Sequence, residues 1–304
     1  MAKTKSSKKS ASSEKSSKES SAEVAPATGL AAALRLPTGE FQLTELSTTP
    51  LAGGPKDKQA AEKALAEFGP SLAEMQEKLH AESTAGGRRS VLLLLQGMDT
   101  AGKDGVISHV VGLLNPGAVH IASFKQPTPD ELAHDFLWRI ENQVPEAGDI
   151  GVFNRSQYED VLIVRVHELV PKAVWAKRFA QINAFERQLA RDGVTVIKCF
   201  LHISKETQAE RLMARLEDPT KYWKYNTGDV DERERWDAYQ EVYTDALRKC
   251  STVGNPWYVI PSDKKWYRNW AVGALLHEKL TALNLQYPPA DFDVATEKKR
   301  VAES

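Results

Sequence analysis

A run of five apolar residues, Val91–Leu95, leads directly into a glycine-rich loop, and this junction constrains the fold more than any other feature of the chain. Such a run is typical of a strand that is covered on both faces. The loop begins at Gly97, and Gly102, Lys103 and Gly105 follow. Backbone N–H groups in such a loop form an anion nest, while the next helix adds its positive end and the lysine a full charge. The spacing matches the first part of the Walker A pattern, so we predict that these four residues bind phosphate.

Two acids distinguish this loop from the usual pattern. Asp104 stands where a serine or threonine normally binds Mg²⁺, and Asp99 lies inside the loop. A carboxylate next to a phosphate is repulsive unless a cation separates them or the carboxylate takes a proton from an attacking oxygen. We therefore predict that Asp99 is catalytic and binds metal, with Lys103 as a second catalytic residue. The alternatives are a turn-forming aspartate and an ordinary glycine-rich turn between a strand and a helix.

Composition limits the classes of function. The 304 residues carry a net charge of -1, which provides no general basic field, so we expect neither nucleic acid nor a membrane as a partner. The cysteines, Cys199 and Cys250, are not in metal or redox spacing, which fits a reducing cytoplasm. No apolar run is long enough to span a bilayer, and the N-terminus lacks the apolar core of a secretory signal. We expect a cytoplasmic protein.

Changes in composition divide the chain. We expect a disordered Lys/Ser-rich tail at residues 1–28, because so few apolar side chains cannot offset the entropy of the chain. Residues 29–89 form an N-terminal extension, with a helix predicted from Lys56 to His80. Residues 90–285 form the core, with a lid at about 205–250, and residues 286–304 form a C-terminal tail.

Strands and helices are predicted to alternate along the core, which indicates an α/β fold with a parallel sheet between helices. Ligands of such sheets bind at the carboxyl ends of the strands. The predicted strands are Val91–Gln96, Val119–Phe124, Ile150–Asn154, Val194–Ile203 and Trp257–Ile260. The predicted helices are Asp104–Leu114, Pro129–Gln143, Lys172–Asp192, Lys205–Leu216, Glu232–Lys249 and Lys265–Leu283.

Polar side chains follow the second and third of these strands. The third strand ends in Asn154, where an aspartate normally helps to hold Mg²⁺, and Arg155 follows. A guanidinium at this edge can bind phosphate oxygens bidentately, although Arg155 could instead pair with Glu159. Glu159 and Asp160 could shape a nucleotide pocket or hold metal. Lys125 follows the second strand, where it is either a phosphate contact or a solvated charge.

A dense segment of cations and aromatic residues follows the fourth strand. Arg211 and Arg215 share one face of a helix, and Lys224 lies in the elbow beyond it. Two helices joined by a basic elbow are typical of a phosphotransferase lid, which brings cations onto the transferred group. The alternative is a charged surface hairpin. In either case, we expect Trp223 and Trp236 to be core residues.

These motifs together resemble the polyphosphate kinase 2 family over residues 35 to 285. The matching segments are Gly97-Met-Asp-Thr-Ala-Gly-Lys-Asp-Gly105, Phe124-Lys-Gln-Pro-Thr128, His134-Asp-Phe-Leu-Trp-Arg139, Phe153-Asn-Arg-Ser-Gln-Tyr-Glu-Asp-Val-Leu162 and Asp218-Pro-Thr-Lys-Tyr-Trp-Lys224. The resemblance implies a P-loop kinase fold of the thymidylate kinase type, a three-layer sandwich with a parallel five-stranded sheet and a helical lid. It also implies transfer of phosphoryl groups between inorganic polyphosphate and a nucleotide, with Mg²⁺, or alternatively Mn²⁺, as cofactor.

The segment Asn154–Asp160 resembles class III of that family, whose members phosphorylate both AMP and ADP. The resemblance implies that Asp99 and Lys103 serve catalysis, that Arg155 binds phosphate, and that Asn154 and Glu159 lie near the acceptor. Further phosphate contacts are expected from Lys125, Lys224 and one or both of Arg211 and Arg215. We expect adenine nucleotides, or also guanine nucleotides, as partners, and a homo-oligomer. The alternatives are an ATP-dependent nucleoside monophosphate kinase and a non-catalytic sensor of nucleotide or polyphosphate.

Overall fold

A computed structural model describes Met1, residues 29–37 and residues 39–304 of the chain. Apart from Met1, the tail expected at residues 1–28 lies outside the described residues. The five strands of the sheet are β1 (Ser90–Gln96), β2 (Val119–Ser123), β3 (Ile150–Asn154), β4 (Val194–His202) and β5 (Trp257–Pro261). All of them pair in parallel in the order β2-β3-β1-β4-β5, which confirms the predicted five-stranded parallel sheet.

The central strand explains why the sheet is covered on both faces. Every residue of β1 is buried, and its neighbours on either side are β3 and β4. Leu95 pairs with Asn154 of β3 and with Cys199 of β4, so the P-loop and the end of β3 leave the sheet at the same edge. The order of the strands therefore places the P-loop, which follows β1, next to the segment that begins with Asn154 at the end of β3.

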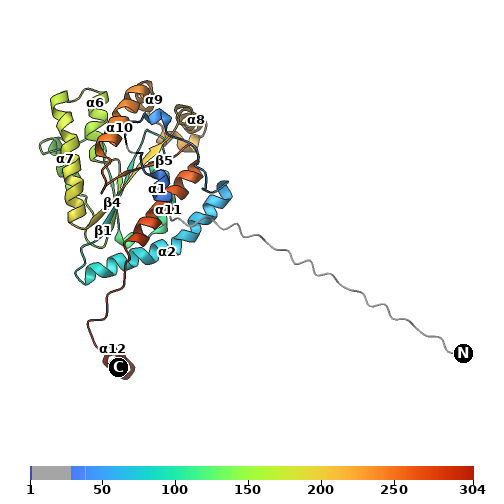
Figure 1. Ribbon diagram of the computed structural model, residues 1–304, viewed down its shortest axis with the longest axis vertical. Coiled ribbons are helices and arrows are strands. Elements are labelled where there is room, and N and C mark those ends of the chain that lie inside the picture. Colours follow the sequence, from blue (N-terminus) through green and yellow to red (C-terminus); the bar gives the residue numbers. More distant parts are fainter. Residues whose placement is uncertain (2–28, 38) are drawn as a thin grey trace.

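Helices form the two outer layers (Figure 1). α6 (Ile163–Val166) and α7 (Lys172–Arg191) lie on one side of the sheet, while α2 (Lys58–Thr84) and α11 (Lys265–Ala282) lie on the other. α2 and α11 pack closely, because Gly273 of α11 has no side chain where Leu65 of α2 approaches. None of the described helices is long and apolar enough to cross a bilayer.

The remaining helices and turns connect these layers. Before β1 the chain forms α1 (Leu30–Leu34) and the 3-10 turn η1 (Leu43–Glu45). Leu36 donates to the carbonyl of Trp257 at 2.9 Å, so this segment covers the edge of the sheet at β5. The others are α3 (Lys103–His109), η2 (Val111–Leu113), η3 (Pro116–Ala118), α4 (Pro129–Leu132), α5 (Trp138–Glu141), η4 (Gln157–Val161), α8 (Lys205–Leu216), η5 (Pro219–Lys224), α9 (Gly228–Glu234), α10 (Trp236–Cys250) and α12 (Val294–Glu303).

Four predicted helices are wrong in extent. The helix expected at Lys56–His80 begins at Lys58 and continues to Thr84. The helix expected at Pro129–Gln143 is two short helices, α4 and α5, because the carboxylate of Asp135 accepts from the backbone of Leu137 at 3.0 Å and competes with helical bonding. The helix expected at Asp104–Leu114 begins at Lys103 and gives way after His109 to the 3-10 turn η2. The helix expected at Glu232–Lys249 is interrupted at Arg235, between α9 and α10.

The two tryptophans of the lid segment differ in burial. Trp236 begins α10 and is buried, as expected, but the prediction for Trp223 is wrong, because its side chain is 79% exposed. Trp223 lies in η5, where its indole donates to the carbonyl of Thr220 at 3.0 Å and the ammonium of Lys224 lies 4.8 Å from its ring centroid. Local bonds therefore hold this ring without any contribution from the core.

Candidate active site

The P-loop adopts a conformation that its glycines permit. Gly97 has a φ of 150°, and a β-carbon there would lie 2.5 Å from the carbonyl oxygen of Leu201 on the neighbouring strand. Lys103 is the first residue of α3, and its ammonium donates to the carbonyl of Gly97 at 2.7 Å. Burial lowers the pKa of Lys103, and the carboxylate of Asp99 opposes that shift. The ammonium therefore lies over the loop, where an anion would relieve the cost of its burial.

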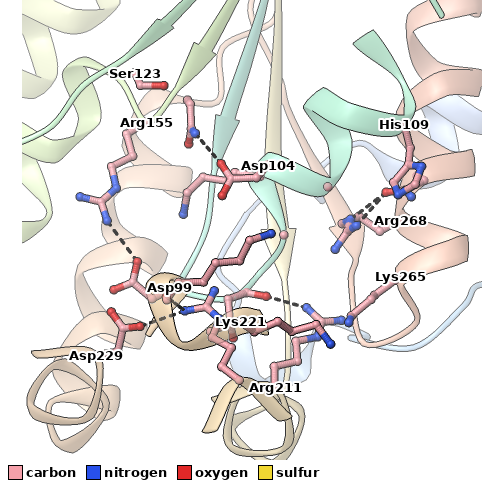
Figure 2. Close-up of a pocket in the computed structure, with 18 of the residues that line it drawn as sticks. Asp99, Asp104, His109, Ser123, Arg155, Arg211, Lys221, Asp229, Lys265 and Arg268 are labelled. Carbon is pink, nitrogen blue, oxygen red and sulfur yellow. Dashed lines mark hydrogen bonds and ion pairs between the residues drawn. The ribbon is translucent and has the colours of Figure 1, made fainter. Parts of the chain in front are cut away.

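Asp99 and Arg155 contact each other across the edge of the sheet, as Figure 2 shows. Nη2 of Arg155 donates to Oδ1 of Asp99 at 3.1 Å. Arg155 has a φ of 65°, an uncommon conformation for a residue with a side chain. Burial lowers the pKa of Arg155, but the charges of Glu159 and Asp99 outweigh it and raise that pKa above its ordinary value. The guanidinium therefore stays charged beside the P-loop.

A cavity of about 720 Å³, here called the basic pocket, lies over the P-loop. It brings together residues from the P-loop, from the ends of β2 and β3, from α8 and α11 and from the elbow η5. A single cavity with so many cations fits an extended polyanion. The cationic residues that line it are Lys103, Lys125, Arg155, Arg211, Arg215, Lys221, Lys224, Lys265 and Arg268.

The two arginines of α8 use their donors on the protein. Arg211 donates to the carbonyl oxygens of Thr100 at 2.8 Å and of Ser262 at 2.5 Å, so it connects the P-loop to the segment that follows β5. Arg215 donates to the carbonyl of Lys224 at 2.8 Å and to the carboxylate of Asp229 at 3.1 Å, so it holds the elbow. Both arginines line the basic pocket, although the hydrogen bonds above are all to protein atoms. Their contact with phosphate therefore stays a prediction.

Sequence reasoning missed the residues that α11 contributes. Arg268 is 3% exposed and donates to the carbonyl of Ala101 at 3.1 Å and to Oδ1 of Asn269 at 2.8 Å. Burial, and after it the charge of Arg211, lowers the pKa of Arg268. Side chains at Gly102 or Gly105 would collide with the guanidinium, so these glycines admit Arg268 to the loop.

A sequence signal for this contribution was available. Lys264 and Lys265 lie three and four residues after the end of β5, at the carboxyl edge where ligands of parallel sheets bind. Figure 2 shows Arg268 and Arg155 on opposite sides of Asp104. The cations of α11 therefore extend the basic pocket away from Arg155.

A second cavity of about 410 Å³, here called the apolar pocket, shares Phe124, Lys125 and Arg155 with the basic pocket. Glu159 and Asp160 line it, and most of its exposed lining is carbon. Its apolar lining comes from the segment after β2 and from α6 and the residues beyond it. These side chains are Phe124, Pro127, Leu132, Ile163, Val164, Leu169 and Val170.

The two acids of this pocket are held differently. Oε1 of Glu159 accepts from Nε2 of Gln96 at 3.1 Å. Asp160 is 9% exposed; its carboxylate accepts from Nη1 of Arg178 at 3.0 Å and lies 3.6 Å from Nη2 of Arg139. Burial raises the pKa of Asp160, while the two arginines oppose that shift. The carboxylate of Asp160 is therefore neutralised by protein cations at the wall of the pocket.

Asn154 lies in the basic pocket, away from the apolar pocket. Its amide Nδ2 donates to Oδ1 of Asp104 at 2.9 Å, so the two residues that depart from the Walker patterns contact each other. Asn154 and Lys125 therefore both lie within the same group of cavities as Asp99, Lys103 and Arg155. The residues predicted for the site are gathered at one edge of the sheet.

The residues present fit a divalent metal that is held mainly by substrate. Within the described residues, no group of three or more His, Cys, Asp and Glu is placed to hold an ion. Mg²⁺ commonly binds through one or two carboxylates and substrate phosphates, which does not require such a group. Asp99, 29% exposed at the P-loop, is the carboxylate best placed for that role. Asp229 lies beside it in Figure 2, and burial, followed by the charge of Asp99, raises the pKa of Asp229.

Fold and site together define a class of protein. A parallel sheet, a P-loop with its lysine, and a pocket lined by cations under the α8–α10 helices are the parts of a P-loop phosphotransferase. Kinases of this class act with a divalent metal. Residues 55–288 match the family model described as Polyphosphate kinase 2 (PPK2). The chain belongs to the polyphosphate kinase 2 family, whose members transfer phosphoryl groups between polyphosphate and nucleotides.

Known proteins agree with this assignment. The chain is 49% identical over 262 residues to an AMP/ADP-polyphosphate phosphotransferase of Meiothermus ruber, which covers 86% of the chain and 96% of that protein. It is 43% identical over 229 residues to an ADP-polyphosphate phosphotransferase of Rhodopseudomonas palustris, covering 71% and 78%. The crystal structure of polyphosphate kinase 2 from Arthrobacter aurescens TC1 superposes with a TM-score of 0.88 at 49% identity, covering 90% of the chain and 97% of that structure.

Proposed function

We propose that this enzyme uses Mg²⁺ to transfer phosphoryl groups from inorganic polyphosphate to both AMP and ADP. The observation that carries the proposal is the junction of the two pockets at Arg155. A cavity lined by cations and a mostly apolar cavity share this guanidinium, which also binds Asp99 of the P-loop. A polyanionic donor and a nucleotide acceptor would therefore meet at one residue.

The basic pocket is the proposed site of the donor. Polyphosphate carries a charge on each repeating unit, so it needs cations spaced along a path more than it needs one deep site. Lys103 and the P-loop would bind phosphates near the reacting end, and Lys265 and Arg268 would bind units farther along. Lys125, Lys224, Arg211 and Arg215 complete the proposed phosphate contacts.

The apolar pocket is the proposed site of the acceptor. Its volume of about 410 Å³ suits a nucleotide, and its carbon-rich wall suits the faces of an adenine or guanine base. Glu159 and Asp160 line this pocket together with Arg155, and their carboxylates would lie near the ribose. Asn154 would approach the acceptor from the basic pocket.

The chemistry follows from charge. An acceptor phosphate oxygen attacks the terminal phosphorus of polyphosphate in line, and the bond from that phosphorus to the oxygen of the next phosphate breaks, so that the shortened polyphosphate leaves. The transition state spreads negative charge over the equatorial oxygens of the transferred group. Lys103 and Arg155 would stabilise that charge, and the P-loop amides would orient the group for attack. Asp99 would hold Mg²⁺, which when bound would supply positive charge to offset the charge of the phosphates. Catalysis would then depend on positioning and electrostatics, without a covalent enzyme intermediate.

One assay tests the proposal. The purified protein is incubated with Mg²⁺ and polyphosphate, first with AMP and then with ADP, and the nucleotides are separated by chromatography. We expect ADP and then ATP. A parallel reaction with AMP and ATP but no polyphosphate tests an ATP-dependent kinase, and D99N is the inactive control. If the protein binds nucleotide but none of these reactions shows turnover, the result would contradict the proposal and support a sensor. Replacing Mg²⁺ with Mn²⁺ tests the second metal.

Two further expectations stay predictions. A homo-oligomer would be detected by light scattering of the purified protein, and a cytoplasmic location by fractionation of cells.

A further inference from the structure

A fully buried ion pair lies just beneath the catalytic edge of the sheet. Lys198 of β4 and Glu186 of α7 are both 0% exposed, and Nζ lies 2.6 Å from Oε2. Lys198 pairs in register with Leu94, and Leu94 pairs with Phe153, the residue before Asn154. Lys198 is therefore one register position away from the end of β3, and the ion pair lies between the sheet and α7.

The pair is costly, so stability alone is a weak reason for it. Removing two charges from water carries a large desolvation penalty, and apolar residues of similar size often stabilise a core more. Each donor of the ammonium nevertheless has a partner. Beyond Glu186, Lys198 donates to the hydroxyl of Tyr158 at 3.1 Å and to the carbonyl of Cys250, the last residue of α10, at 2.6 Å.

The pair holds the turn that follows Arg155. Oε1 of Glu186 accepts from the hydroxyl of Tyr158 at 2.7 Å and from Nε2 of Gln157 at 3.2 Å. Burial, and after it the charge of Glu186, raises the pKa of Tyr158 well above its ordinary value, so the hydroxyl keeps the proton that it donates. The ion pair is thus connected to two consecutive residues of η4.

The other side of the same turn is held from the P-loop strand. Nε2 of Gln96, the last residue of β1, donates to Oγ of Ser156 and to Oε1 of Glu159, both at 3.1 Å. Side-chain hydrogen bonds therefore hold all four residues from Ser156 to Glu159: Gln96 binds the outer two, and Glu186 binds the middle two.

This anchoring has a consequence for Arg155, which precedes the turn. With a φ of 65°, Arg155 occupies a region that is unfavourable for a residue with a side chain. Such conformations persist where the surroundings constrain the backbone on several sides. The bonds to Glu186 and Gln96 supply that constraint immediately after Arg155.

We propose that Glu186, Lys198 and Tyr158 are positioning residues that fix the turn Gln157–Val161, so that Arg155 is directed at Asp99 and at the junction of the two pockets. The proposal rests on the role of Arg155 in the proposed function. The three residues act through Arg155, because they are buried and line neither pocket.

A double-mutant cycle tests this connection. Y158F removes the hydroxyl but leaves the ion pair, and we expect the kcat/KM for ADP to fall about 5- to 10-fold at temperatures well below the Tm. In an R155A background, the same substitution should change kcat/KM less than about 2-fold, because the residue through which it acts is gone. Additive effects in the two backgrounds would overturn the proposal.

A matched pair of double variants separates anchoring from charge. E186Q/K198M and E186M/K198M both remove the ion pair, but glutamine keeps an acceptor for Tyr158 and Gln157. We expect E186Q/K198M to be at least about 5-fold more active in kcat/KM for ADP. E82Q, which removes the charge of Glu82 from its ion pair with Arg89 at the opposite edge of the sheet, is the control for lost stability without lost activity.

The outcomes are distinct. Equal activity in the two folded double variants would overturn the proposal. The proposal would also be overturned if the loss of activity followed the loss of Tm in every variant, E82Q included. If the double variants fail to fold, the double-mutant cycle of Y158F and R155A alone decides whether the proposal holds. Absence of turnover in the unmodified enzyme would instead contradict the proposed function, so that enzyme is measured first.

Discussion

The carboxylate of Asp99 and the guanidinium of Arg155 are joined at 3.1 Å, although 56 positions separate the residues in the chain. The contact connects the P-loop after β1 with the backbone after β3, and it lies where the basic and apolar pockets meet. A carboxylate that can hold metal and a cation that can hold phosphate therefore form one unit. The predictions below test the parts of that unit and its surroundings.

Replacing Asp99 by asparagine should lower kcat by about two to three orders of magnitude, because the side chain keeps its shape but loses the charge that attracts Mg²⁺. Circular dichroism and Tm should match the unmodified enzyme within a few degrees. A metal titration that follows the electron paramagnetic resonance of Mn²⁺ should show weaker binding in the presence of polyphosphate. Near-normal turnover would remove Asp99 from the mechanism.

Replacing Lys103 by alanine should lower kcat/KM for both substrates by about 100-fold, because one preorganised cation at the transferred group is lost. Lys103→Arg is the matched variant, and its bulkier guanidinium should restore little activity because the ammonium fits closely over Gly97. Steady-state kinetics with each substrate varied in turn measures the effect. An unchanged kcat/KM would show that the lysine does not contact the reacting phosphates.

Replacing Arg268 by methionine should raise the KM for polyphosphate about 10-fold, since a hydrogen bond to a charged group contributes roughly 1.5 kcal/mol. The free protein should be as stable or more stable, because within the described residues this buried guanidinium forms no salt bridge. Calorimetry measures Tm, and kinetics measures KM. R268K is the control that keeps the charge; a loss of stability with unchanged KM would assign Arg268 to the fold alone.

The affinity for polyphosphate should weaken as the pH rises. This weakening should occur at a lower pH than it would if Lys265 were an exposed lysine. Burial, followed by the charges of Arg211 and Arg268, lowers the pKa of Lys265. Bound phosphate favours the charged amine, so KM is lowest below that pKa and rises as pH passes through it. KM is measured from pH 7 to about 10.4. It should begin to rise at a higher pH for K265R than for the unmodified enzyme, because arginine keeps its charge. Identical profiles would place Lys265 outside the path of polyphosphate.

Several features of the site could be read from local sequence, since neighbours in the chain form them. The anion nest needs only Gly97, Gly102 and the start of a helix, because the directions of successive N–H groups depend on local backbone angles. The parallel sheet followed from alternating patterns, and the edge rule then placed Lys125 and Arg155 near the P-loop.

Other features depended on packing between distant segments. Arg268 enters the loop from α11; the position of α11 after β5 indicates the edge of the sheet, but the direction of this side chain depends on packing. Trp223 was expected in the core because tryptophan is large and apolar, but its neighbours in η5 hold it at the surface.

The sequence by itself determined the P-loop, the parallel sheet and the family, because short-range backbone geometry and hydrophobic pattern carry that information. Tertiary structure alone decided which cations share a cavity, that Asp99 and Arg155 touch, and that the pair of Lys198 and Glu186 lies beneath the turn after Arg155. The physical reason is the strand order. β1 lies between β3 and β4, and only that order brings side chains from distant segments within hydrogen-bonding distance.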